Sequence, residues 1–212
     1  MGDNRFFPEL PTVRLLIFVE GANDIEFLKR ISRLIHLADP LLPDLTSAES
    51  EKKVLFLPIG GSEQRIWIGR LSPLHVPEFH LFDRDVPPST ELRHAAVNAV
   101  NMLPNCRAAM TGLRALENYL HPAAIFEARG LTVSFTGEDD VPIIVAQESY
   151  VRTGGQQNWL EIPSRHRKRF SYQAKRWLNT EAADRMTFQR LEQQDPSGDV
   201  RSWLKTIAGY LK

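Results

Sequence analysis

The chain has 212 residues, of which 42% are hydrophobic and 25% charged, and this suits one globular domain with a small appendage rather than two full domains. The chain has 26 Lys and Arg residues and 26 Asp and Glu residues, so its net charge is zero. This excludes attraction of the whole molecule to nucleic acid or membrane, and any phosphate-binding surface must be a local patch. The single cysteine excludes an internal disulfide, and without a secretory signal pattern or a membrane-length apolar run we expect a cytoplasmic protein with no membrane contact.

Apolar runs and helical periodicity alternate along the first half of the chain. Strands are predicted over residues 14–19, 53–59, 78–82 and 106–111. Helices are predicted between them, over 23–37, from a turn at 60–62 to about 70, and over 90–103, where Leu92, Ala96, Val100 and Leu103 share one face. Asn23, with Glu26 three residues later, has the arrangement of an N-cap and capping box.

This alternation predicts an α/β fold with a parallel sheet of about four strands, covered by helices on both faces, as in Rossmann-like folds. Beyond Glu117 the pattern loosens into a helix starting at ENYLHP (117–122), a polar loop at 136–142 and an apolar segment at 141–146. The last third is predicted to be helical and to end in an amphipathic helix over 200–211. We therefore expect a core over 12–122 and a mainly helical extension over 123–212 that packs on the core or completes it.

Acidic residues follow two of the predicted strands, and a glycine turn follows a third. Glu20 ends the first strand, Gly60-Gly61 ends the second, and Asp83 and Asp85 end the third within the segment LFDRD. Because the carboxyl ends of parallel strands meet at one edge of a sheet, we expect the three carboxylates to gather there. Asp83 and Asp85 would point to the same side if the backbone stays extended beyond the strand.

Oxygen ligands collected in this way suit Mg²⁺ or Mn²⁺, and the histidines and cysteine show no spacing typical of a zinc site. Each part also has a simpler interpretation. A D-x-D pair is common in solvated turns, Asp24 and Glu26 are acids of the kind that favour a helix N-terminus, and Gly60-Gly61-Ser62 fits any tight turn before a helix. The combination, rather than any single part, indicates a metal site.

Three segments in order, FVEGANDIEFL, LPIGGS and FHLFDRD, resemble a TOPRIM domain, the catalytic fold shared by topoisomerases, bacterial primases and several nucleases. The family pattern of a glutamate, a glycine turn and a D-x-D after successive strands matches Glu20, Gly60-Gly61 and Asp83 with Asp85. The resemblance covers roughly residues 12–122. LRALENYLHP (113–122) further resembles OLD-family nucleases and stand-alone TOPRIM effectors of phage-defence systems.

The resemblance implies an endonuclease that hydrolyses phosphodiester bonds of DNA or RNA, including tRNA, with two Mg²⁺ or Mn²⁺ ions. By this carry-over the metal ligands are Glu20, Asp24, Asp83, Asp85 and Glu117. A lysine near the reacting phosphate, with Glu20 and Asp83, would complete the catalytic set; Lys175 in YQAKRWLNTEAADRMT is the better match, and Lys168 is the competitor.

OLD-family nucleases carry an ATPase, and no G-x-x-x-x-G-K-[ST] motif is present here, so the resemblance implies a separate ABC-type ATPase subunit in an anti-phage system. Two alternatives stay open: a TOPRIM protein with other phosphoryl chemistry, such as RNA maturation or a topoisomerase-like or primase-like reaction, and an inactive TOPRIM module that only binds. A homo-oligomer is compatible with the sequence.

A basic segment, SRHRKRFSYQAKR (164–176), places aromatic residues Phe170 and Tyr172 among its positive charges. This pattern predicts contacts with nucleic acid, in which the basic side chains bind phosphates and the aromatic rings stack on bases. The alternative interpretation is a basic helix face that is simply exposed to solvent. The predicted nucleic-acid-binding residues are Arg165, Arg167, Lys168, Arg169, Lys175 and Arg176.

Overall fold

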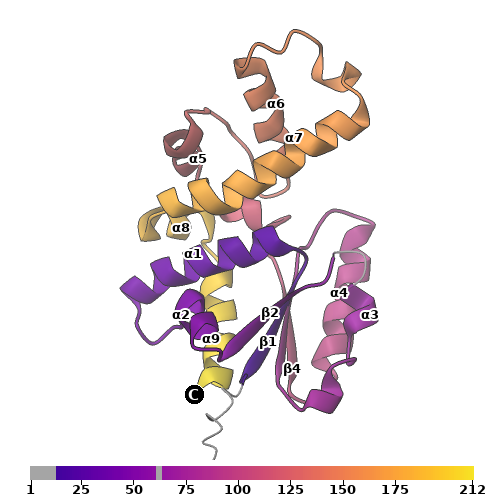
Figure 1. The fold of residues 1–212 in the computed structure, drawn as a ribbon, viewed down its shortest axis with the longest axis vertical. Coiled ribbons are helices and arrows are strands. Elements are labelled where there is room, and N and C mark those ends of the chain that lie inside the picture. The colour runs from indigo at the N-terminus through magenta and orange to yellow at the C-terminus, as the bar shows by residue number, and fades with distance from the viewer. Residues whose placement is uncertain (1–12, 61–63) are drawn as a thin grey trace, which may run out of the picture.

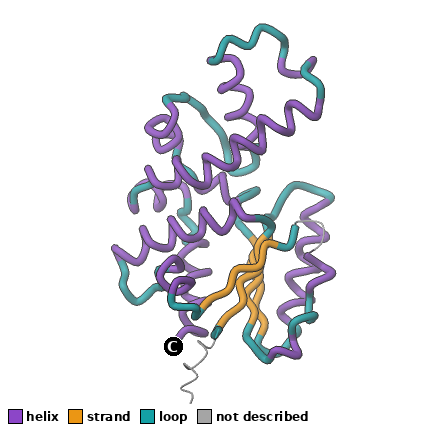
Figure 2. The backbone as a smooth tube through the Cα atoms, in the orientation of Figure 1, coloured by secondary structure: helices purple, strands orange, loops and turns teal. Residues whose placement is uncertain are grey.

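The computed structural model describes residues 13–60 and 64–212, and it contains a four-stranded, fully parallel sheet. The strands are β1 (Leu15–Val19), β2 (Val54–Pro58), β3 (Glu78–Phe82) and β4 (Cys106–Met110), in the spatial order β2-β1-β3-β4. Figure 2 shows the strands as the centre of the lower part of the molecule. The predicted α/β class and the number of strands are confirmed.

Helices cover both faces of this sheet (Figure 1). One face carries α1 (Ala22–Ala38), α2 (Leu45–Ser50) and α9 (Asp199–Leu211), and the other carries α3 (Gln64–Trp67) and α4 (Ser89–Asn101). Because successive side chains of a strand alternate between faces, Leu15, Ile17 and Val19 pack into the larger core under α1. Phe82 of β3 joins Ala96 of α4 in a smaller core on the opposite side.

The remaining helices form an upper lobe that projects beyond the sheet in Figure 1. They are α5 (Pro122–Arg129), α6 (Val141–Arg152), α7 (Ser164–Trp177), a π-helical turn (Leu178–Ala182) and α8 (Phe188–Gln194). Short 3₁₀ turns lie at Ser72–Leu74, Leu116–Tyr119, Trp159–Glu161 and Ala183–Arg185. Helices α6 and α7 pack together and enclose an aromatic cluster of Tyr150, Trp159 and Phe170.

The two parts of the chain share the larger core, which includes residues on both sides of the expected boundary at 122/123. Helix α9 packs on β1, and Val200, Trp203 and Ile207 are buried there. The carboxy-terminal extension thus completes the core of the sheet. Within the described ranges, no helix has the length and apolar character needed to cross a membrane.

Several local predictions were wrong. Helix α1 begins one residue early, at Ala22, and the side chain that caps it is Asp24 rather than Asn23: the backbone N–H of Gly21 donates to Asp24 Oδ2 over 2.8 Å. Helix α2 was not predicted, although Asp44 gives the signal by accepting a hydrogen bond from the Thr46 N–H.

Two further elements differ from their predicted extent. The helix after β2 covers only Gln64–Trp67 among the described residues, and Gly61 and Ser62 of the predicted turn lie outside them. The ENYL segment is a 3₁₀ turn, because the helix begins only at Pro122, which suits a first helical position. Leu92, expected in the core, is 55% exposed in the first turn of α4.

Candidate functional site

A cavity of about 240 Å³ lies at the carboxyl edge of the sheet and gathers acidic side chains from separate segments. Glu20 follows β1, Asp83 and Asp85 follow β3, and Glu117 lies in the 3₁₀ turn beyond β4. Lys175 reaches the cavity from α7. The other lining residues are Arg114, Ala115, Asn118, Asp139, Asp140, Val141, Pro142, Ser171 and Tyr172. The predicted meeting of strand-end carboxylates is therefore found in the structure.

Asp83 is the most buried of the strand-end carboxylates, with 5% of its surface exposed. Burial raises its pKa well above the ordinary value, the charge of Lys175 opposes this shift, and the carboxylate of Glu20 adds to it. Within the part of the chain that the structure describes, the Asp83 carboxylate has no hydrogen bond and no ion pair. A buried acid without a donor is energetically costly and is a natural place for a cation.

Asp85 lies in the cavity wall for a different reason from the one expected. Its φ of 57° is left-handed, so the backbone does not stay extended after β3. Its N–H instead donates to the carbonyl of Arg114 over 2.9 Å, which fixes the turn against the segment beyond β4. The expected extended geometry is therefore wrong, although Asp83 and Asp85 do line one cavity.

Arg93 of α4 joins the acids of two strands. Its Nη2 lies 2.6 Å from Glu20 Oε1 and 3.0 Å from Asp85 Oδ2. Burial raises the pKa of Glu20 to about 7, and the nearby Arg93 works against that rise. Sequence patterns gave no indication of Arg93, because it lies in the second turn of α4 and its acidic partners follow β1 and β3.

Lys175 makes the second set of charge contacts. Its Nζ lies 3.2 Å from Asp24 Oδ1 and 3.4 Å from Glu117 Oε1. Burial disfavours its charge, but the carboxylates of Glu117 and Asp24 outweigh burial and raise the pKa of Lys175, so the side chain stays protonated. Lys168, seven residues earlier, is exposed and does not line the cavity, so the geometry favours Lys175 as the lysine at the acidic site.

Glu117 is held by a residue that the sequence analysis did not identify. Asn179, fully buried in the π-helical turn, donates from Nδ2 to Glu117 Oε1 over 2.5 Å. Single π-helical turns are frequent at functional sites because they re-aim one side chain. The contact spans 62 residues of sequence, so no local pattern could have revealed it.

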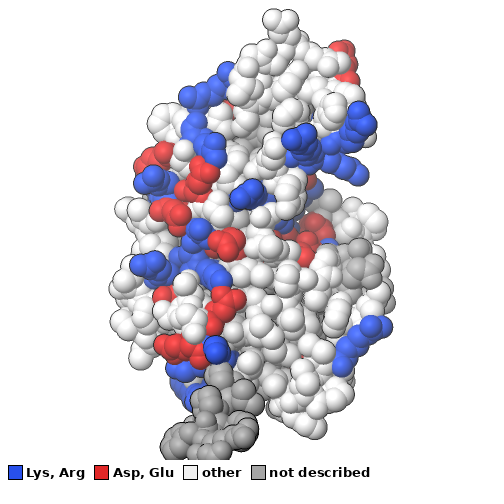
Figure 3. Space-filling model, in the orientation of Figure 1, with Lys and Arg blue, Asp and Glu red and all other residues white. Residues whose placement is uncertain are grey.

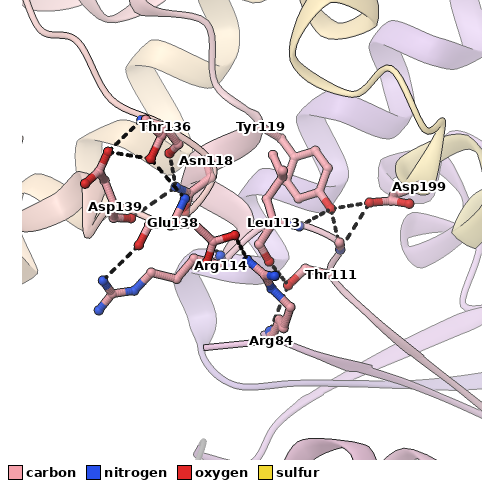
Figure 4. Close-up of polar contacts among 12 residues, drawn as sticks. Arg84, Thr111, Leu113, Arg114, Asn118, Tyr119, Thr136, Glu138, Asp139 and Asp199 are labelled. Atoms are coloured by element: carbon pink, nitrogen blue, oxygen red, sulfur yellow. Dashed lines mark hydrogen bonds and ion pairs between the residues drawn. The ribbon is translucent and has the colours of Figure 1, made fainter. Parts of the chain in front are cut away.

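The other residues of the ENYL segment form its scaffold (Figure 4). Asn118 Nδ2 donates to the carbonyls of Thr136 and Asp139, at 2.9 and 3.0 Å, and ties the 136–140 loop to the cavity wall. The Tyr119 hydroxyl donates to Asp199 Oδ2 over 2.6 Å. Glu117 is thus buried in a turn whose next two residues are both anchored by hydrogen bonds.

The acids of the cavity suit a hard divalent cation by donor chemistry, because Glu20, Asp83 and Glu117 bring carboxylate oxygens from three separate segments. Asp24 is buried, and its Oδ1 forms an ion pair with Lys175 Nζ at 3.2 Å. Arg93 and Lys175 draw the acids into pairs, and across 13–60 and 64–212 no three acidic, histidine or cysteine side chains are positioned to ligate one ion. In this arrangement Glu20 and Asp85 are paired with Arg93.

The basic helix α7 divides its side chains between different surroundings. Of the six basic residues predicted to bind nucleic acid, Lys175 lines the acidic cavity, and Arg176 lines a separate cavity. Phe170, a predicted stacking residue, instead packs against Tyr150 and Trp159. Tyr172 is 66% exposed and lines the acidic cavity.

No protein-family model, no curated protein and no solved structure matches the chain.

Proposed function

We propose that the protein is a divalent-metal-dependent phosphodiesterase that cuts nucleic acid as an endonuclease. The supporting observation is the cavity in which carboxylates that follow β1 and β3, a carboxylate from the turn beyond β4 and a lysine from α7 face one another. Structural ion pairs seldom need so many acids from distant segments in one partly buried place, because each buried carboxylate costs free energy. The proposal also draws on the resemblance to TOPRIM nucleases.

In this proposal Glu20, Asp83 and Asp85 hold one ion, and Asp24 with Glu117 contribute to a second. Bound Mg²⁺ or Mn²⁺ would supply Lewis-acid stabilisation of the phosphate and a more acidic water. The residues of the chain orient those ions. Asn179 keeps the Glu117 carboxylate facing the cavity, and Arg93 offsets the repulsion between Glu20 and Asp85 in the metal-free protein.

Lys175 stabilises negative charge that develops on the phosphoryl oxygens. Its raised pKa keeps the ammonium charged at any physiological pH, and its position between Asp24 and Glu117 holds it at the cavity rather than in solvent. A fixed cation in a partly desolvated site stabilises a transition state more than the same charge in water.

The direct test is cleavage of labelled single-stranded and duplex DNA and RNA by purified protein, with Mg²⁺, with Mn²⁺ and with chelator. We expect cutting only with a divalent ion, and loss of cutting in Glu20→Gln and Asp83→Asn. Glu148→Gln, an exposed acid on α6, is the matched control and should cut as the parent does. Equal cutting by Asp83→Asn and the parent, or none by the parent on any substrate, would reject the proposal.

A second candidate function is a metal-free module that binds nucleic acid without cutting it. The observation that favours it is the pairing of four of the acids with Arg93 and Lys175, which offsets part of their charge without any ion. Calorimetric titration with Mn²⁺ separates the two candidates. Binding at millimolar or lower concentration that disappears in Asp83→Asn supports the enzyme, and the absence of binding supports the module.

The resemblance extends the proposal to a biological setting, in which the protein is the effector of an anti-phage system and acts with a separate ABC-type ATPase. The same acids would also serve RNA maturation or another phosphoryl reaction. Analysis of the product ends distinguishes these reactions. Hydrolysis leaves one strand end with a terminal phosphate and the other with a terminal hydroxyl, whereas strand transfer joins nucleic-acid strands and primer synthesis extends one.

A further inference from the structure

We propose that the substrate is engaged as a single strand laid along one face of α7, with an unpaired base stacked on Tyr172 at the entrance of the acidic cavity. This inference rests on the proposed function, because it names the class of substrate that the same cavity receives. It goes beyond a general basic patch by specifying which face of the helix is used and why duplex nucleic acid is disfavoured.

Spacing on the helix defines this face. Arg165, Lys168, Tyr172 and Lys175 are separated by three, four and three residues, and side chains at such spacings lie one above another on an α-helix. At 1.5 Å per residue the row extends over about 15 Å. It begins at the exposed start of α7 and ends at the lysine inside the cavity. We call these four residues the α7 track.

Tyr172 stands apart from the other aromatic residues of the upper lobe. Phe170 is packed in the cluster with Tyr150 and Trp159, so it stabilises the α6–α7 contact. Tyr172 is 66% exposed and makes no ring contact, hydrogen bond or ion pair with the described residues, yet it lines the same cavity as Asp83. An exposed ring beside a phosphate-processing site is suited to stacking on a base.

Charge distribution supports the same path. The carboxylates of the cavity repel a polyanion, so the substrate needs a cationic approach that leads to them. Figure 3 shows basic side chains on the upper lobe next to a hollow in which acidic side chains are visible. Arg165 and Lys168 are exposed on this approach, and neither forms an ion pair with a described residue. Their charges are therefore available to phosphates.

Stacking on Tyr172 selects single strands, because a base inside a duplex is already stacked on both faces and must be flipped out before it can meet a protein ring. A single strand presents its bases at no such cost. The cavity of about 240 Å³ also holds the reacting group within reach of Lys175 and the acids, only three residues from Tyr172 on the same helix.

The test is equilibrium binding by fluorescence anisotropy in the presence of chelator, so that cleavage does not interfere. The probes are one short labelled DNA strand, the RNA strand of the same sequence and the DNA duplex. We expect the full-length protein to bind a single strand at least about tenfold more tightly than the duplex, and Tyr172→Ala to lose at least about fivefold of that affinity. The two single-stranded probes show whether the natural strand is DNA or RNA.

Matched variants separate stacking from charge. Tyr172→Trp should retain single-strand binding, while Tyr172→Leu, which keeps apolar bulk without a flat ring, should lose it. Lys168→Ala should weaken binding to every probe and reduce its dependence on salt. Lys205→Ala, an equal charge change at an exposed residue of α9 rather than of α7, should change binding much less.

Three results would overturn the inference: duplex bound as tightly as single strands, Tyr172→Ala and Tyr172→Leu equal to the parent, or no binding to any probe. Failure of the proposed function is separate, since it appears as absence of metal-dependent cutting. If the protein cuts but shows no preference for single strands, the phosphodiesterase proposal is supported and the role of the α7 track is rejected. If binding depends on Tyr172 but no cutting is found, the role of the α7 track is supported and the enzyme proposal is rejected.

Discussion

At the level of single residues, the acidic cavity is a set of buried charges held by two cations. Arg93 joins Glu20 to Asp85, Lys175 joins Asp24 to Glu117, and Asp83 is left with no direct partner among the described residues. Evolution of a purely structural core would favour apolar residues here, because buried ion pairs are often no better than well-packed hydrophobic ones. The proposed function, rather than stability, accounts for this arrangement.

Asp83→Asn should stabilise the metal-free protein while it removes activity. The variant replaces a buried acid whose pKa is raised by burial with a neutral amide of the same shape. We expect cutting to fall by at least about a hundredfold and the midpoint of thermal unfolding at pH 8 to rise by about 2–4 °C, or about 1 kcal/mol for a chain of this size.

The stability difference has a defined dependence on pH. Because the folded protein holds the Asp83 proton to higher pH than the unfolded chain does, the free energy of unfolding of the parent falls as pH rises above the ordinary aspartate range. Asp83→Asn has no such titration. The free energies of unfolding of the two proteins should therefore be similar near pH 4, and that of Asp83→Asn should be higher at pH 8. A variant less stable than the parent at pH 8 would show that Asp83 contributes favourable contacts.

Glu20 should make the proposed metal binding depend on pH. Its pKa of about 7 means that a divalent ion must displace a proton at pH 6 but not at pH 8. We expect the affinity for Mn²⁺ to rise over this range, by up to tenfold per pH unit below the pKa for one displaced proton. In the absence of metal the same raised pKa makes the folded state less stable as pH rises from about 4.5 to about 7.

Calorimetry at pH 6 and pH 8, in two buffers of different ionisation enthalpy, measures both the affinity and the protons released. Glu148→Gln should behave as the parent does, since Glu148 is exposed on α6. An affinity that is equal at the two pH values would mean that Glu20 does not ligate the ion.

The sequence predicted the strand-end acids because their positions follow from strand ends alone, and the sheet then brings them together. It did not predict Arg93 or Asn179, since each acts across a tertiary contact: 73 residues separate Arg93 from Glu20, and 62 separate Asn179 from Glu117. It also did not predict that Asp85 reaches the cavity through a left-handed backbone conformation rather than an extended one.

At the level of elements, the turn that carries Glu117 depends on the loop at 136–140. Asn118 is 2% exposed, receives a hydrogen bond from the Ala115 N–H, and donates to the loop carbonyls of Thr136 and Asp139. Arg114 adds an ion pair to Asp140 at 2.9 Å. The cavity wall is therefore one connected polar network, shown in Figure 4, rather than two independent loops.

Asn118→Ala should loosen this wall. The change leaves buried backbone groups without partners and should cost about 1–3 kcal/mol of unfolding free energy. Hydrogen–deuterium exchange should increase in the 136–140 loop more than in the sheet. Asn98→Ala, an exposed asparagine on α4, is the control and should change neither quantity. Unchanged exchange at 136–140 in Asn118→Ala would show that the loop is held by other contacts.

Periodicity alone predicted the strands to within one residue at each end, because four short apolar runs leave little choice of register. The predicted basic character of α7 was also visible, but its division into a face toward the acidic cavity and a face toward another cavity was not. That division depends on which side of α7 packs against α6. The sequence of α7 alone does not show which side this is.

At the level of the whole molecule, the carboxy-terminal extension is part of the folding unit. Helix α9 covers β1, and α7 supplies Lys175 to acids that precede it by more than fifty residues. A fragment of residues 1–122 would expose the larger core and leave the acids of the cavity without Lys175. We expect this fragment to show no cooperative thermal transition by circular dichroism, whereas a cooperative transition would establish an autonomous core.

The overall charge balance conceals a local separation of charge. Positive side chains concentrate on α7, and carboxylates concentrate in the cavity below it, so the molecule is neutral in total and polar across the proposed substrate path. A neutral protein of this kind should bind nucleic acid with a modest salt dependence set by the few cations of the α7 track.

The most direct measurement is anomalous scattering from Mn²⁺ in crystals of the full-length protein grown or soaked with the ion. The account predicts a manganese peak in the acidic cavity, bonded to oxygens of Glu20 and Asp83 at roughly 2–2.5 Å, with the Arg93 contact to Glu20 released. An empty cavity at saturating Mn²⁺, with Arg93 still joining Glu20 to Asp85, would contradict it.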